Sequence, residues 1–202
     1  MEQARNTKQQ QKQQQHEQQK QHKLTVPVLP EELFLLEAGD TVSLSGTILT
    51  GRDAAHKRMM ECLDKGLSLP FDIKDQGIYY TGPCPAAPGK IIGSCGPTTS
   101  SRMDGYTPRL LDLGLKIMIG KGQRSPEVID AMVRNRAVYL AAVGGAAARI
   151  AQCVRRAQVI AFGDLGPEAV YRLEVENFPL IVAIDARGNN LYDIGPGRYK
   201  LL

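Results

Sequence analysis

Apolar residues recur along the chain in short runs of strand length, and segments with the composition of helices separate these runs. The first run, 42–49, alternates between apolar and small polar residues, as expected of a half-buried strand. Further strands are predicted at 78–81, 115–119, 138–143, 158–162 and 180–185. Helices are predicted at 54–64, 103–113, 125–135 and 145–156. Strands that alternate with helices predict an α/β domain.

Several helix ends carry residues that are common at such positions. Pro30-Glu31-Glu32 places a proline and two acids where the first turn of a short helix would lie. Ser125-Pro126-Glu127 combines a serine cap, a proline at the first position and an acid beside the helix dipole. Gly114 is predicted to end the helix at 103–113, and 187–190 is predicted to form a turn.

Residues 1–23 differ from the rest of the chain. Ten of them are glutamine, and Met1 is the only large apolar residue among them. Such a segment has little to bury, so we expect a disordered N-terminal tail and a single domain at 24–202. The tail also carries +3 of the chain's net charge of +4. The remaining domain is nearly neutral, and a nucleic-acid-binding surface is therefore not indicated.

Composition indicates a cytoplasmic protein. The 202 residues, 43% of them hydrophobic, are enough for one well-buried domain. No apolar run is long enough to span a membrane or to form the core of a secretory signal, so no membrane association is expected. The four cysteines have no regular spacing and form no CxxC pair, which favours reduced thiols in a reducing compartment.

Glycine-containing loops follow four of the strand-like segments. Arg52 lies in the loop after 42–49, Lys121 lies between two glycines after 115–119, and Gly144-Gly145 follows 138–143. The fourth loop contains the run Gly96-Pro97-Thr98-Thr99-Ser100-Ser101-Arg102-Met103-Asp104. Ligands of open α/β sheets bind beyond the carboxyl ends of the strands. We therefore expect Arg52, Arg102 and Lys121 to converge on a ligand with more than one negative charge.

The run at 96–104 is itself suited to an anion. Gly-Pro forces a turn, and the hydroxyl residues that follow are typical of a helix N-terminus, where unpaired N–H groups attract negative charge. Arg102 adds a guanidinium that matches a carboxylate or a phosphate. An ordinary capped helix with a surface arginine explains this run alone equally well.

Four motifs occur in the order of a known family: Gly-Arg-Asp-Ala-Ala-His (51–56), the run at 96–104, Gly-Lys-Gly (120–122) and Glu-Val-Glu-Asn-Phe-Pro (174–179). Across 25–193 the chain resembles the C-terminal domain, or separate β subunit, of class I iron–sulfur fumarate hydratases and the related L-tartrate dehydratases. The resemblance implies an α/β domain of the swivelling β/β/α type, with a mixed sheet flanked by helices.

The resemblance also implies the activity, which is the reversible hydration of fumarate to L-malate, a reaction of the tricarboxylic acid cycle. A [4Fe-4S] cluster would be ligated by the cysteines of a partner α subunit, with no metal ligand on this chain. The α subunit would be an obligate partner at a shared site, in an α2β2-type assembly. This chain alone would then be inactive.

Residue roles follow from the same resemblance. Thr98 aligns with the proposed general base, and Arg52 and Lys121 align with residues that bind the substrate carboxylates. Arg102, four residues after Thr98, would grip the same dicarboxylate substrate from one helical face. Capping of the helix by Thr98 or Thr99 remains an alternative for Thr98.

Weaker candidates and two other functions stay open. Asp53 and Asp104 each neighbour a proposed site arginine and could orient it; His56 is expected on a helix surface or behind the site, and Cys95 as a buried thiol. The chain could instead be the β subunit of L-tartrate dehydratase. A stand-alone anion- or nucleotide-binding α/β module is the third possibility, although neither GxxxxGK[ST] nor GxGxxG after a strand occurs.

Overall fold

The computed structural model describes residues 20–143 and 145–199. Most of the expected tail, residues 1–19, lies outside the described residues. Its end was assigned wrongly, because Gln21–Lys23 already belong to a strand that pairs with 41–43. Within the described part of the chain, no helix has the length and apolar character needed to cross a membrane.

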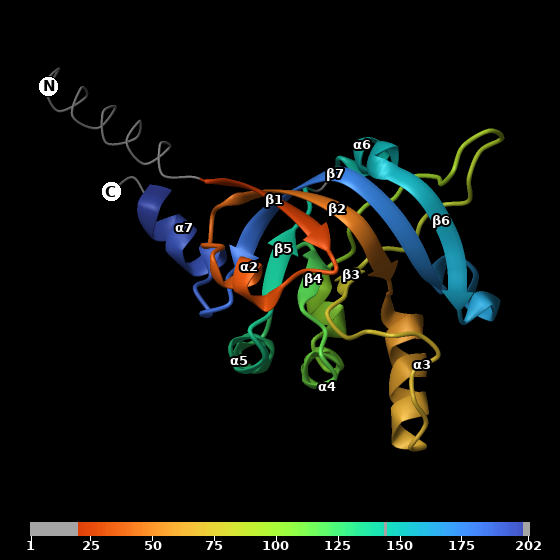
Figure 1. Cartoon of the computed structure of the whole chain (residues 1–202), viewed down its shortest axis with the longest axis horizontal. Helices are drawn as coiled ribbons and strands as arrows, with labels where there is room; N and C mark the ends of the chain where they lie inside the picture. Colours follow the sequence, from red (N-terminus) through yellow and green to blue (C-terminus); the bar gives the residue numbers. More distant parts are fainter. Residues whose placement is uncertain (1–19, 144, 200–202) are drawn as a thin grey trace, which may run out of the picture.

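The mixed α/β architecture is confirmed (Figure 1). The strands are β1 (Gln21–Val26), β2 (Thr41–Thr50), β3 (Gly77–Tyr79), β4 (Ile117–Gly120), β5 (Val138–Ala141), β6 (Val154–Ala161) and β7 (Val170–Ile184). The α-helices are α2 (Pro30–Phe34), α3 (Asp53–Asp64), α4 (Thr107–Asp112), α5 (Pro126–Asn135), α6 (Ala147–Cys153) and α7 (Leu191–Tyr199). Two 3₁₀ helices, η1 (Ser100–Met103) and η2 (Gly163–Glu168), complete the elements.

The strands form one sheet in the order β1-β2-β3-β4-β5-β7-β6, and an additional β2–β7 pairing closes part of it on itself. Strands β1 to β5 run parallel to their neighbours in this order, whereas β7 is antiparallel to β2, β5 and β6. Strands β2, β3, β4, β5 and β7 therefore pair in a closed circuit. Figure 1 shows β2 and β7 arching together above the shorter central strands.

Two apolar clusters lie on either side of the central strands. One gathers Tyr79, Ile119 and Leu140 with side chains of β2 and β7, and so fills the closed circuit. The other packs Ile78, Met118 and their neighbours against α3, α4 and α5, which lie below the sheet in Figure 1. Strands buried on both faces are continuously apolar, which explains why these segments do not alternate in the sequence.

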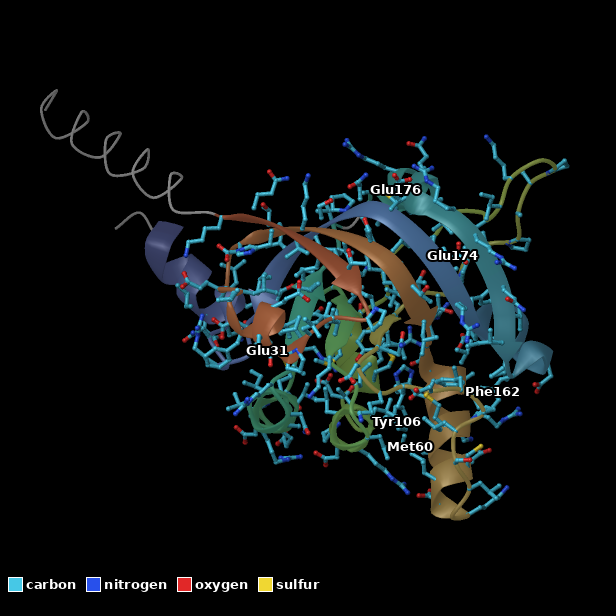
Figure 2. All side chains as sticks on the ribbon, in the orientation of Figure 1. Glu31, Met60, Tyr106, Phe162, Glu174 and Glu176 are labelled. Carbon is cyan, nitrogen blue, oxygen red and sulfur yellow. The ribbon has the colours of Figure 1, made fainter. Side chains whose placement is uncertain are left out.

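Strand β7 is much longer than the strand predicted at 180–185. It includes Glu174–Pro179, and its bend at Asn177 has a left-handed φ of 53° where the backbone N–H donates to Ser45 Oγ. Figure 2 shows Glu174 and Glu176 along the β6 side of the arch, away from α3 and α4. Glu174 pairs with Arg156, and Glu176 pairs with Arg155. The motif Glu-Val-Glu-Asn-Phe-Pro (174–179) therefore contributes to strand pairing in the sheet.

Two predicted helices were partly wrong. The helix expected at 145–156 ends at Cys153, because Val154 pairs with Val175 and begins β6. The helix expected at 103–113 is divided into η1 and α4. Asp104 lies at the break, and its carboxylate accepts hydrogen bonds from Arg124 Nε (2.7 Å) and from the backbone N of Ser125 (2.7 Å). The helices at 54–64 and 125–135 are confirmed as α3 and α5.

Candidate active site

The predicted site residues lie at one edge of the sheet. Strands β2, β3 and β4 are parallel, so the segments that follow them start from the same side. The backbone N of Thr98 donates to the carbonyl of Tyr80, just after β3, at 2.8 Å. Thr99 forms a parallel bridge with Lys121, and Ser100 N donates to the Lys121 carbonyl at 2.9 Å. The backbone thus places Thr98 beside the exposed Lys121.

Arg52 and Arg102 meet at Asp53. Arg102 Nε donates to Asp53 Oδ1 at 2.8 Å, and Arg52 Nε lies 3.9 Å from Asp53 Oδ2. One carboxylate therefore lies between two guanidinium groups. The segment 98–102 contacts Lys121 at one end and the start of α3 at the other, so the structure brings all four predicted residues to one region.

Of the two threonines considered as helix caps, Thr99 and not Thr98 is the N-cap residue of η1, and it makes no side-chain cap hydrogen bond. η1 is a four-residue 3₁₀ helix, too short to present the helix dipole that was expected to attract an anion. The α-helix that begins at the site is α3, whose N-cap residue is Arg52.

Glu168 and Gly82 border Arg52, and the sequence reasoning missed both. Glu168 Oε2 accepts a hydrogen bond from the backbone N of Ala54 at 3.0 Å, and Oε1 lies 3.6 Å from Arg52 Nη2. Gly82 gives room to the arginine, because a Cβ there would lie 2.9 Å from Arg52 Cδ and 3.1 Å from the carbonyl of Pro167. These contacts join residues far apart in the sequence, where no local pattern could indicate them.

His56 is buried, so the alternative of a helix-surface histidine was wrong. Its Nδ1 donates to the Arg52 carbonyl at 2.8 Å in the neutral form, and its ring packs between Tyr80 and Tyr106. Figure 2 shows Tyr106 in the space between α4 and α3. Burial lowers the pKa of His56 from 6.5 to about 4. The imidazole is therefore uncharged at neutral pH and adds no positive charge to the site.

A third arginine, Arg124, lies in a buried polar network close to the site. Its Nε donates to Asp104 at 2.7 Å and its Nη2 donates to Thr107 at 2.8 Å. The guanidinium carbon lies 5.2 Å from the ring centres of both Tyr80 and Tyr139. Asp104 thus orients Arg124 and not Arg102, whereas Asp53 does bond to a proposed site arginine.

Three buried side-chain atoms make no hydrogen bond among the described residues, namely Arg52 Nε, Asp53 Oδ2 and His56 Nε2. All three belong to the start of α3. A buried polar atom without a partner costs about 1–3 kcal/mol, so a cluster of them calls for an explanation other than stability. The Arg52 donor and the Asp53 acceptor lie 3.9 Å apart, too far for a hydrogen bond, and both are covered by the surrounding residues.

The described residues do not form a metal site. In the part of the chain that the structure covers, no group of three or more histidine, cysteine, aspartate or glutamate side chains could hold a metal ion. All four cysteines are unpaired. Cys95 is buried as predicted, and burial raises its pKa to about 11, so it remains a protonated thiol. The residues present therefore do not fit an iron–sulfur cluster held by this chain.

Comparison with known proteins gives consistent results. The family model of the fumarase C-terminus matches residues 1–195. The aerobic class I fumarate hydratase of Salmonella typhimurium is 43% identical over 153 residues, which are 75% of this chain and 26% of that protein. Fumarate hydratase 2 of Leishmania major is 38% identical over 172 residues, 84% of this chain and 30% of that protein. The chain spans less than a third of these relatives.

One relative is of similar length to the chain. It is a protein of Methanocaldococcus jannaschii named "Putative L(+)-tartrate dehydratase subunit beta". The two are 42% identical over 164 residues, which are 78% of this chain and 84% of that protein.

Proposed function

This chain belongs to the class I fumarase C-terminus family, and we propose that it is the β subunit of a fumarate hydratase that converts fumarate reversibly to L-malate. The observation that carries the proposal is the grouping of Arg52, Arg102 and Lys121 at one sheet edge, with the Arg52 Nε donor unpartnered among the described residues. Three cationic side chains at one edge, only partly balanced by Asp53 and Glu168, suit a dicarboxylate.

The cations also suit the chemistry of a hydro-lyase. Removing a proton next to a carboxylate builds up negative charge on that carboxylate as the carbanion-like species forms. Arg52, Arg102 and Lys121 would bind the substrate carboxylates and stabilise this charge. The wall that they form would be one side of a shared active site.

Thr98 is proposed as the general base, and its location supports this role. Thr98 directly precedes Thr99, which forms a β-bridge with Lys121. Thr99 also takes the N-cap position of η1, which weakens the helix-cap alternative for Thr98. A hydroxyl is a weak base, and the nearby cations would favour its deprotonated form. Thr98→Ala should lower kcat far more than it changes KM, whereas similar changes in both would indicate a positioning role.

The partner is proposed to be a cluster-carrying α subunit in an α2β2-type assembly. Two findings support it: no cluster-binding group exists among the described residues, and the relative of similar length is named as a subunit beta. A [4Fe-4S] cluster held by the α subunit would supply a Lewis-acidic iron to the bound substrate. We expect the complex in the cytoplasm, where the four unpaired cysteines would stay reduced.

L-tartrate dehydratase is the second candidate. The Methanocaldococcus relative favours it, because its length is covered to 84%, against 26% for the fumarate hydratase of Salmonella. The substrates differ by one hydroxyl group, and the cationic residues would serve either one.

Anaerobic assays would test the proposal. Fumarate hydration, followed by the loss of ultraviolet absorbance, would be measured with the full chain alone, with a cluster-loaded α subunit alone, and with both; L-tartrate dehydration would be measured in parallel. We expect activity only in the mixture, and the preferred substrate would separate the two enzymes. Lack of both activities in a stable complex would contradict the proposal. Tight nucleotide binding by the chain alone would favour a binding module.

A further inference from the structure

Arg52 lies between two carboxylates and is hydrogen-bonded to neither. Arg52 Nη2 lies 3.6 Å from Glu168 Oε1, and Nε lies 3.9 Å from Asp53 Oδ2. Both distances exceed that of a normal N–H···O hydrogen bond. The two negative charges therefore attract the guanidinium group without using its donors, and the buried Nε has no partner among the described residues.

Glu168 is itself firmly held. Its other carboxylate oxygen accepts the backbone N–H of Ala54 in the first turn of α3, at 3.0 Å. The N-terminus of a helix attracts negative charge, so this location suits a carboxylate. The carbonyl of the preceding residue, Pro167, also lies near Gly82: a Cβ there would lie 3.1 Å from this oxygen and 2.9 Å from Arg52 Cδ. η2 thus forms a fixed wall along the arginine.

We propose that Glu168 is a positioning residue for Arg52. It keeps the guanidinium extended over Gly82, with Nε covered beside Asp53, so that the exposed part of the group stays directed to the substrate carboxylate. The identity of that substrate rests on the proposed function, but the orientation of Arg52 does not. An amide at position 168 could still accept the Ala54 hydrogen bond, but it would no longer attract the guanidinium.

The same two elements provide a matched control. Asp164 also lies on η2, and its Oδ2 accepts a hydrogen bond from Arg58 Nη2 of α3 at 2.9 Å. Arg58 lies over the ring of Phe162, which Figure 2 shows beside α3. Asp164→Asn therefore removes an acid–arginine contact between η2 and α3 without touching Arg52.

Hydrogen exchange at the Arg52 Nε–H tests the orientation without any assay of activity. The full chain would be labelled with ¹⁵N, and the Arg52 signal would be assigned as the one missing in Arg52→Lys. We expect Glu168→Gln to speed this exchange by about tenfold, as for the loss of a charged partner, and Asp164→Asn to leave it unchanged. Unchanged exchange in Glu168→Gln, or equal acceleration in both variants, would overturn the proposal.

Kinetics of the assembled α–β complex provide a second readout. Glu168→Gln should lower kcat/KM by about tenfold, mainly by raising KM, and Asp164→Asn should have no effect. In an Arg52→Ala background, Glu168→Gln should change nothing further, because Glu168 acts through Arg52. If Glu168→Gln lowers kcat/KM by the same factor in the wild type and in Arg52→Ala, the proposal is overturned. If the wild-type complex turns over neither fumarate nor tartrate, the proposed function fails, and the exchange experiment alone decides the role of Glu168.

Discussion

Arg124 and Arg52 lie in neighbouring regions of the molecule but in opposite environments. The side chain of Arg124 is 0% exposed, donates to Asp104 and Thr107, and packs on two tyrosine rings. The side chain of Arg52 is 27% exposed, and its buried Nε has no partner among the described residues. The nitrogens of the Arg124 guanidinium are hydrogen-bonded within the fold, whereas Nε of Arg52 makes no hydrogen bond among the described residues.

The comparison shows how to tell a structural cation from a binding one. Taking a guanidinium out of water is costly unless the protein replaces its hydrogen bonds. Around Arg124 this replacement is complete, so a ligand would find no donor there. Around Arg52 the carboxylates of Asp53 and Glu168 provide charge without close hydrogen bonds. We therefore propose that Arg124 stabilises the fold and that Arg52 binds the substrate.

The largest effect is expected from Arg124→Ala. It should lower the free energy of unfolding by about 3–5 kcal/mol, because Asp104 would remain largely buried without its charged partner. Urea denaturation of the full chain would measure it. Arg134→Ala removes an arginine whose pair with Asp112 is exposed, and should cost about 1 kcal/mol or less. Equal losses of unfolding free energy in the two variants would contradict the distinction between the buried and the exposed arginine.

Arg52→Ala should show the reverse behaviour. We expect kcat/KM of the assembled enzyme to fall about 10²–10³-fold, as for the loss of one charge-stabilising donor. The free energy of unfolding should change by about 1 kcal/mol or less, because the ion pairs of Arg52 are long and partly exposed. A large loss of stability with activity retained would show that Arg52 is a structural residue like Arg124.

The burial of His56, close to Arg52, should make the free energy of unfolding depend on pH. His56 has a pKa of about 4 in the fold and 6.5 when unfolded, so between these values the unfolded chain binds more protons. Stability is full above pH 6.5 and falls by about 3 kcal/mol as the pH decreases to 4. Unfolding measured across this range should show that loss in the wild type and lack it in His56→Gln; identical profiles would contradict the assignment.

The smallest effect is expected from Gly82→Ala. The added methyl group would lie 2.9 Å from Arg52 Cδ, so the flexible arginine must move aside. Stability should fall by only about 1 kcal/mol, while KM rises several-fold. A methyl group at Gly105 would meet nothing within 4 Å, which makes Gly105→Ala the matched control. Equal KM values for the two variants would show that the position of Arg52 is unimportant.

Local patterns in the sequence predicted much of the fold and part of the site. Residues 42–49 and 125–135 carry a clear period or a strong cap, and both became the expected elements. The loops with Arg52 and Lys121 start at the same edge because parallel strands precede them. The prediction of one helix at 103–113 was wrong, because the contact of Asp104 with Arg124, 20 residues away, interrupts the helix.

Features that depend on distant contacts escaped prediction for the same reason. The first half of β7 pairs with β2 and β6, and this pairing, rather than local hydrophobicity, makes it a strand. Glu168 reaches the site only because η2 packs against α3, across 114 residues of sequence. Burial of Arg124 could not be predicted either, since an isolated arginine after Gly122 resembles any surface residue.

A structure of the assembled α–β complex with a bound dicarboxylate would show directly whether Arg52 binds the substrate. We predict one substrate carboxylate within about 3 Å of a guanidinium nitrogen of Arg52, with Arg102 and Lys121 close by and Arg124 still enclosed by Asp104 and the tyrosines. A dicarboxylate bound entirely by the α subunit, with Arg52 contacting only the carboxylates of its own chain, would contradict the account.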